Sequence, residues 1–201
     1  MEEKISKISH KLKKTLDKNR YDHTMGVMYT AAALAMRYGA DMEQALIAGL
    51  LHDCAKCLSA DKRIKICEKY NIPVSKAEKE NPSLLHAKLG ACLAWKKYKV
   101  RDRAVLSAIA SHTTGKPGMS LLDKIVYIAD YIEPGRRELP DMSRIRKLAF
   151  ENIDECLMVM LRGSLAYLRT KNLTVDPMTE KTYSYYKEIT EQKEKLRKEE
   201  R

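Results

Sequence analysis

The sequence is poor in residues that interrupt regular secondary structure, with only 8 glycines and 6 prolines among 201 residues. So few interruptions favour long regular elements joined by few turns. No stretch approaches the ~18 uncharged apolar residues that a membrane-spanning helix needs. The first 20 residues also lack the apolar core of a signal peptide. These absences predict a protein with no membrane partner, and a cytoplasmic location is the default expectation.

Cysteine is scarce as well, and the pattern of cysteines argues against disulfides. There are 5 cysteines, an odd number, in a chain long enough to fold without a disulfide framework. Cys54 and Cys57 form a Cys-x-x-Cys pair, but no second pair and no β-α-β context accompanies it. We therefore interpret them as small thiols inside the fold rather than as zinc ligands or a redox pair.

Acidic residues are outnumbered by basic ones, 27 against 38, which gives a formal net charge of +11. A basic balance favours anionic partners such as nucleotides, nucleic acid or a membrane surface, without choosing among them. The composition is otherwise 44% hydrophobic and 32% charged, which is typical of a folded domain and too apolar for a disordered chain.

Apolar residues recur at helical spacing along almost the whole chain, and the alternation expected of strands is absent. The pattern predicts an all-α fold. A helix over residues 21–38 should stop at Gly39, a suitable left-handed cap. Asp41 should cap the next helix, and Ser120 with Asp123 resembles a capping box that opens another.

No internal repeat or low-complexity linker divides the chain. Asp141 should cap a long helical region that continues to about Lys171, and Pro177 should then open a charged terminal helix. We therefore predict one domain over residues 1–172 and a charged C-terminal helical tail over residues 173–201.

Two aspartates occupy segments that are too apolar to leave a carboxylate in water. Asp53 follows His52 at the end of the apolar run 45–51, and Asp130 lies within the apolar run 125–132. Burying an ionised carboxylate without a positive partner is very costly. A metal ion would satisfy both aspartates, and imidazole with carboxylate is a suitable set of ligands.

Each position taken alone has a simpler explanation. A single histidine near an apolar face is more often a hydrogen-bonded core residue, and Asp53 could pair with Lys56 one turn away. The joint pattern is harder to attribute to chance. A His-Asp pair on an apolar helix, with His23 upstream and Asp130 in a second apolar helix downstream, favours a metal site.

The order His23, His52-Asp53, Asp130 resembles the HD-domain superfamily of metal-dependent phosphohydrolases, and the added His86 and His112 resemble its two-metal members. Longer segments are similar to the YqeK-type bis(5′-nucleosyl)-tetraphosphatases (symmetrical). These segments are Arg20 to Thr24, His52 to Lys56, Ser111 to Gly115 and Ala129 to Arg136. The resemblance extends over about residues 15–170.

The resemblance implies a helical bundle that holds two metal ions, usually iron, and that cleaves diadenosine tetraphosphate symmetrically into two ADP. The reaction would proceed by attack of a metal-bridging hydroxide, and a homodimer is suggested. The implied ligands are His23, His52, Asp53 and Asp130 for one ion, and His86 and His112 for the second, with Asp53 bridging the two.

The chemistry supports this arrangement independently of the resemblance. Two metal ions ~4 Å apart can activate a water molecule and neutralise charge on a phosphoryl group, so the protein mainly positions the substrate and balances charge. Asp53 and Lys56 are therefore predicted as catalytic residues. The predicted substrate contacts are Lys56, Thr113, Thr114, Lys116 and Arg136. For Lys116 and Arg136 a solvated surface charge is an equally good interpretation.

Two other functions stay open at this point. One is an HD phosphohydrolase that acts on another nucleotide, because the sequence hides the shape of the pocket. The other is a basic module that binds RNA or a ribonucleoprotein and keeps a structural metal site. Against the second stands the set of six ligands, since a structural site is usually closed and four-coordinate. A dinucleoside polyphosphate is therefore the expected partner, and nucleic acid is disfavoured.

Overall fold

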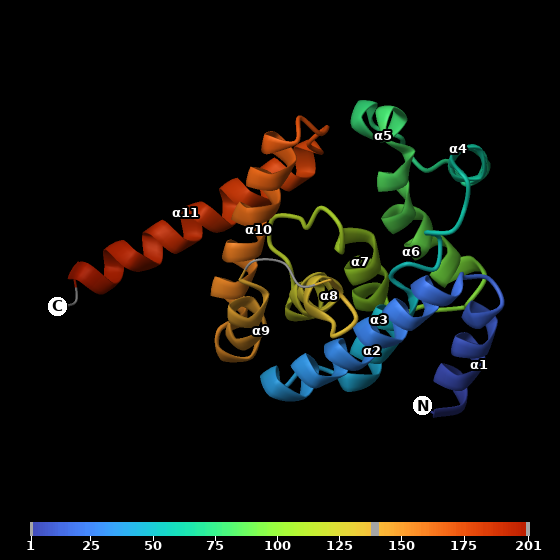
Figure 1. Ribbon diagram of the computed structural model, residues 1–201, viewed down its shortest axis with the longest axis horizontal. Coiled ribbons are helices and arrows are strands. Elements are labelled where there is room, and N and C mark those ends of the chain that lie inside the picture. Colours follow the sequence, from blue (N-terminus) through green and yellow to red (C-terminus); the bar gives the residue numbers. More distant parts are fainter. Residues whose placement is uncertain (1, 138–140, 200–201) are drawn as a thin grey trace.

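The computed structural model describes residues 2–137 and 141–199, and these residues form helices joined by turns and loops (Figure 1). The predicted all-α fold is confirmed for this part of the chain. The helices are α1 (Glu2–Lys13), α2 (Lys18–Tyr38), α3 (Met42–Leu51), α4 (Ala60–Lys69), α5 (Lys76–Glu80), the short 3₁₀ helix η1 (Pro82–Leu85), α6 (His86–Lys96), α7 (Arg103–Ser111), α8 (Leu121–Ile132), α9 (Met142–Glu151), α10 (Ile153–Thr170) and α11 (Pro177–Glu199).

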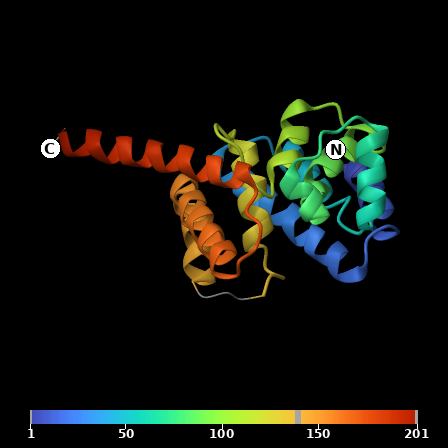
Figure 2. The same ribbon diagram turned by 90° about the horizontal axis from the view of Figure 1, so that it is seen from above.

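The centre of the molecule is built from α2, α3, α7 and α8, which pack against one another, while α6 covers α7 and α10 covers α8 (Figures 1 and 2). Leucine and isoleucine side chains fill the space between these helices. The largest fully buried ones include Leu34, Leu50, Leu51, Ile109, Ile125 and Ile128. Burial of such side chains supplies most of the driving force for folding.

Three predicted helix boundaries are confirmed. Gly39 ends α2 in the left-handed conformation with φ 68°, which glycine adopts without a steric penalty. The Asp41 side chain accepts a hydrogen bond from the backbone N–H of Gln44 at the start of α3. Ser120 and Asp123 form the reciprocal capping box that opens α8.

The predicted helical region from Asp141 to about Lys171 is present, but its cap and its continuity differ from the expectation. Asp141 has a φ of 67° and makes no side-chain hydrogen bond to cap α9. The region is also two helices rather than one, because Asn152 is extended and its side chain accepts from the N–H of Glu155 to cap α10. A short polar side chain that bonds to the backbone competes with helix continuation.

Helix α11 packs on the domain along its first part and then extends beyond it (Figures 1 and 2). Thr182 is fully buried, and the hydroxyl of Tyr186 accepts a hydrogen bond of 2.7 Å from the backbone N–H of Met119. Farther along the helix, Leu196 is largely exposed. The segment predicted as a tail thus contacts the domain through its first turns.

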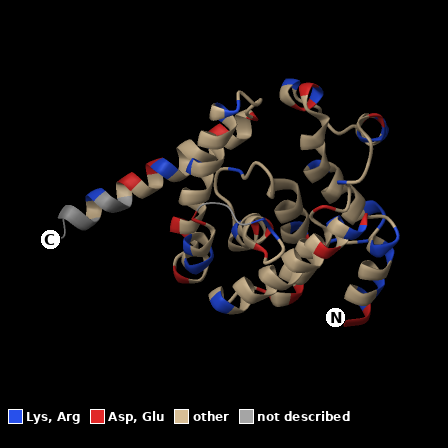
Figure 3. Ribbon diagram, in the orientation of Figure 1, with Lys and Arg blue, Asp and Glu red and all other residues tan. Residues whose placement is uncertain are grey.

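Charged residues are spread over several helices rather than gathered by sign on one of them. Figure 3 shows Lys and Arg interspersed with Asp and Glu along the described part of α11, where Lys187 lies 3.7 Å from Glu191. None of the described helices combines the length and the apolar character that crossing a membrane requires.

The backbones of α2 and α3 come close together at Gly49, which allows a sharp test of this packing. A Cβ atom added at Gly49 would lie 2.9 Å from the Cα of Met28, a backbone atom that cannot move alone. We expect Gly49→Ala to lower the free energy of unfolding by about 1–3 kcal/mol, because the helices must separate. Urea denaturation would measure the change.

Gly163 provides the matched control for this substitution. It lies inside α10 with no atom within 4 Å of an added Cβ. Because alanine favours a helix over glycine, Gly163→Ala should raise the free energy of unfolding by about 0.5–1 kcal/mol. Equal effects of the two substitutions would contradict the proposed close contact between α2 and α3.

Candidate metal centre

The His52-Asp53 pair lies just beyond α3 rather than on it, which corrects the expected placement. The helix ends at Leu51, and the chain continues in tight turns in which the N–H of Cys54 bonds to the carbonyl of Leu51 and the N–H of Lys56 bonds to that of Asp53. These turns keep both side chains inside the bundle, since His52 is 0% and Asp53 2% exposed.

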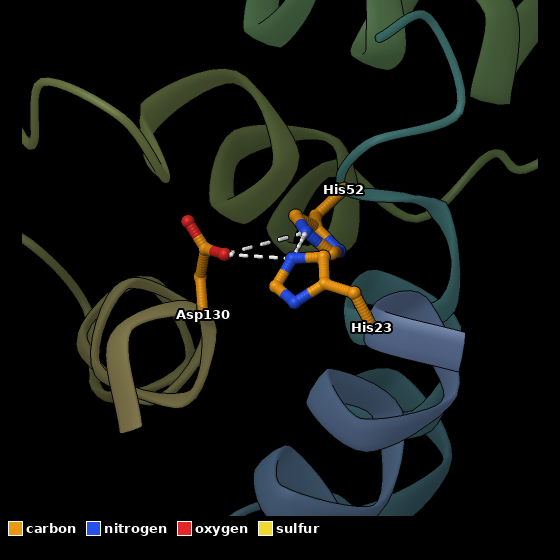
Figure 4. Close-up of side chains that lie close together, drawn as sticks. All are labelled: His23, His52 and Asp130. Carbon is orange, nitrogen blue, oxygen red and sulfur yellow. Dashed lines mark hydrogen bonds and ion pairs between the residues drawn. The ribbon is translucent and has the colours of Figure 1, made fainter. Parts of the chain in front are cut away.

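His23, His52 and Asp130 come from three separate segments and point toward one another (Figure 4). The Nε2 atom of His23 lies 3.0 Å from Oδ1 of Asp130 and 3.3 Å from Nε2 of His52. The Nε2 atom of His52 lies 3.6 Å from the same Asp130 oxygen. These three side chains could hold one metal ion.

Asp53, His86 and His112 come together beside this first group. Oδ1 of Asp53 lies 3.3 Å from Nε2 of His86 and 3.7 Å from Nε2 of His112. Its other oxygen, Oδ2, lies 3.6 Å from Nε2 of His52. The two oxygens of Asp53 thus face the two groups of histidines, and the structure brings all six predicted ligands together.

The four imidazole rings form a row from His23 through His52 and His112 to His86. Successive ring centroids are 5.3, 5.0 and 4.9 Å apart. In His52, His86 and His112 the Nδ1–H donates to a backbone carbonyl three residues earlier in the chain. Because a carbonyl can only accept, each Nε2 lone pair is free to face the centre of the group.

This arrangement of donor atoms fits a metal cation. The Nε2 atoms of His86 and His112 lie only 3.1 Å apart, and the Nδ1–H of each ring donates to a backbone carbonyl. Oδ1 of Asp53 is buried and has no hydrogen-bond partner. Facing lone pairs and an unpaired carboxylate oxygen repel one another, whereas a divalent cation between them would be bound by all three.

The protonation states of His86 and Asp53 at neutral pH suit metal binding. Burial lowers the pKa of His86 to about 3, with the neighbouring His112 adding to the effect, so its imidazole is neutral. Burial alone would raise the pKa of Asp53, but the imidazoles of His52, His112 and His86 outweigh it and hold the pKa well below the usual range. The centre therefore presents a neutral imidazole at His86 and an ionised carboxylate at Asp53, which are the forms that bind metals.

Three cationic side chains lie at the edge of this centre. Lys56 places Nζ 3.3 Å from Nε2 of His86, and burial lowers its pKa. Arg136 donates to Oδ1 of Asp130, and Arg20 donates to Oδ2 of Asp53 at 2.6 Å. Arg20 was not predicted as a site residue. Its position one helical turn before His23 is the signal that could have identified it.

The other predicted substrate contacts lie at different distances from the centre. Oγ1 of Thr113 is 3.1 Å from Nε2 of His86 and 3.2 Å from Nε2 of His112. Thr114 donates instead to the carbonyl of Gly115. Lys116 pairs with the buried Asp123 at 2.9 Å. Thr113 alone among these three contacts the centre directly.

Glu133 is a second site residue that sequence reasoning missed. Its Oε1 accepts from Nδ1 of His23 at 2.9 Å, and its Oε2 accepts from the N–H of Gly135 at 2.6 Å. Glu133 is 2% exposed, and a Cβ at Gly26 would clash with its Oε2. The only signal in the sequence is the position of this acid, immediately after the apolar segment that carries Asp130.

Histidines and aspartates that converge inside the helical bundle define a helical domain with two groups of side chains that could each hold a metal ion. The family model for the HD domain matches residues 20–135, more than half of the chain. The chain belongs to the HD domain family.

Relatives and a solved structure agree with this assignment. The chain is 40% identical to the symmetrical bis(5′-nucleosyl)-tetraphosphatase of Bacillus subtilis, over 87% of this chain and 92% of the relative. It is 38% identical to the protein of that name from Halalkalibacterium halodurans, over 86% and 91%. A crystal structure from Clostridium acetobutylicum, described as a predicted HD superfamily hydrolase involved in NAD metabolism, aligns with a TM-score of 0.88. It has 41% identity and covers 92% of this chain and 97% of that one.

The hydrogen bond from His23 to Glu133 generates a prediction about metal affinity. Removing the acceptor in Glu133→Ala frees the His23 ring to rotate, so we expect metal affinity to fall about 10- to 100-fold. Glu133→Gln keeps an oxygen acceptor and should lose less. Competition with a chromogenic chelator would measure both, and equal losses would show that charge rather than ring orientation matters.

Proposed function

We propose that this protein is a metal-dependent hydrolase that cleaves diadenosine tetraphosphate symmetrically into two ADP. The observation that carries the proposal is the convergence of the Asp53 carboxylate with four inward-facing imidazoles. Relatives that the chain matches over most of their length are named for this activity. The reaction breaks a phosphoric anhydride bond with water.

The proposed ligand sets are His23, His52, Asp53 and Asp130 for one ion and His86 with His112 for the second, with Asp53 shared. We propose iron for both ions. When bound, the ions would lower the pKa of a water molecule and neutralise charge on the attacked phosphoryl group.

The chain's own cations would bind the polyphosphate. Lys56 is the best placed, because its ammonium group already lies beside the imidazole of His86 and would face a non-bridging phosphate oxygen. Arg20 and Arg136 flank the two aspartates, and a guanidinium group can bind two phosphate oxygens at once. Thr113 would donate to a phosphate oxygen, with Thr114 and Lys116 contacting the chain farther from the centre.

We also propose that the protein works in the cytoplasm and that two copies of it assemble as a homodimer. Light scattering coupled to size-exclusion chromatography would measure the mass of the assembly in solution.

Substitution of Asp53 and Lys56 separates metal binding from catalysis. Asp53→Ala should lose both ions and all activity, because its two oxygens face both groups of histidines. Lys56→Ala should keep the metal and lower kcat by about 100- to 1000-fold, as expected when one donor to a phosphoryl oxygen is removed. Elemental analysis by mass spectrometry, combined with steady-state kinetics, would measure these effects and identify the metal.

Asp61→Ala serves as the control, since Asp61 lies exposed in the first turn of α4. It should match the unsubstituted protein in metal content and rate. Full activity in Asp53→Ala would refute the proposed centre.

Product analysis tests the symmetry of cleavage. Diadenosine tetraphosphate should give ADP as the sole nucleotide product, whereas asymmetric cleavage would give ATP and AMP. Deoxynucleoside triphosphates and nucleoside monophosphates, assayed under the same conditions, should be hydrolysed more slowly. A higher kcat/KM for one of these would assign the centre to another nucleotide.

A further inference from the structure

A cavity of about 750 Å³ opens beside the metal centre, between α2, the end of α8 and α9. Its volume falls in the range of small-molecule pockets. Two of the residues that line it, His23 and Glu133, belong to the centre just described. A ligand in this cavity would therefore lie directly against a side chain whose Nε2 atom faces Asp130.

The walls of the cavity are largely apolar and carry two aromatic rings. Tyr29 and Phe150 line it and are 63% and 38% exposed. Ala33, Ile132 and Pro134 complete the apolar surface. Exposed aromatic rings on the wall of a cavity are suited to stacking against the flat face of a base, because every base has a π-face.

The charged groups in the cavity do not favour a phosphate chain there. Arg146 donates to the carbonyls of Ile132 and Glu133, which fastens the end of α8. Asp22 pairs with Lys18, and both Asp22 and Glu133 bring negative charge. The metal centre and its neighbouring cations suit phosphates, whereas this cavity suits the uncharged part of a nucleotide.

We propose that the cavity binds one nucleoside of the substrate, with the base stacked on Tyr29 and Phe150 and the phosphate chain leading past His23 into the metal centre. The proposal rests on the hydrolase function and adds where the nucleoside lies. The cavity then provides affinity for nucleotides over simple polyphosphates, and its aromatic side chains act in binding rather than in the chemical step.

Filling the cavity tests the proposal directly. Ala33→Trp places an indole in the cavity from α2, and Tyr29→Ala removes one stacking surface without adding bulk. We expect Ala33→Trp to raise the dissociation constant of ADP at least 10-fold, and Tyr29→Ala to raise it about 5- to 100-fold, the usual effect of losing one stacked aromatic. Inorganic pyrophosphate, which has no nucleoside, should bind within twofold of its original affinity.

Met36→Trp is the matched control, because Met36 is exposed on α2 and does not line the cavity. Calorimetry on metal-loaded protein gives both affinities, and metal content shows that the centre is intact. Equal loss of ADP and pyrophosphate binding, or no loss of either, would overturn the proposal. Failure of the unsubstituted protein to cleave diadenosine tetraphosphate would refute the proposed function. Selective loss of ADP binding in the variants would still place the nucleoside in this cavity.

Discussion

The structure depends on the burial of the Asp53 carboxylate among imidazole rings, with the Arg20 guanidinium bonded to one of its two oxygens. Its Oδ1 has no hydrogen-bond partner, and three of the surrounding rings have Nδ1–H fixed on backbone carbonyls. A buried carboxylate oxygen without a partner is costly in free energy. A metal ion would satisfy Oδ1 and the facing imidazole nitrogens together, so the packing that buries Asp53 also favours metal binding.

Helix ends account for much of this geometry. The carbonyls of Gly49 and Ile109 lie in the last turns of α3 and α7, where backbone acceptors have no partner within the helix. They accept instead from His52 and His112, which stand immediately beyond those helices. A backbone carbonyl that has no partner within the helix therefore orients a metal ligand.

The sequence was sufficient to predict the all-α fold, several helix caps and the convergence of six side chains, because each depends on local patterns or on a resemblance in spacing. The sequence was insufficient where long-range packing decides which side chains meet. Glu133 matters only because α8 ends beside His23, and Arg20 only because its guanidinium reaches Asp53, 33 positions later. The break at Asn152 depends on a choice between helix continuation and a side-chain cap, which apolar periodicity does not reveal.

His23 and Glu133 line the cavity and also belong to the metal centre. Binding of a nucleoside in the cavity is therefore linked to the position of a metal ligand. Glu133 orients His23 through one oxygen and holds the Gly135 turn through the other, while Arg146 fixes the carbonyl of Glu133 from α9. A nucleoside in the cavity would press on the same residues that position a metal ligand. Binding of the base and placement of the phosphate chain would then be coupled through His23 and Glu133, which line the cavity and belong to the centre.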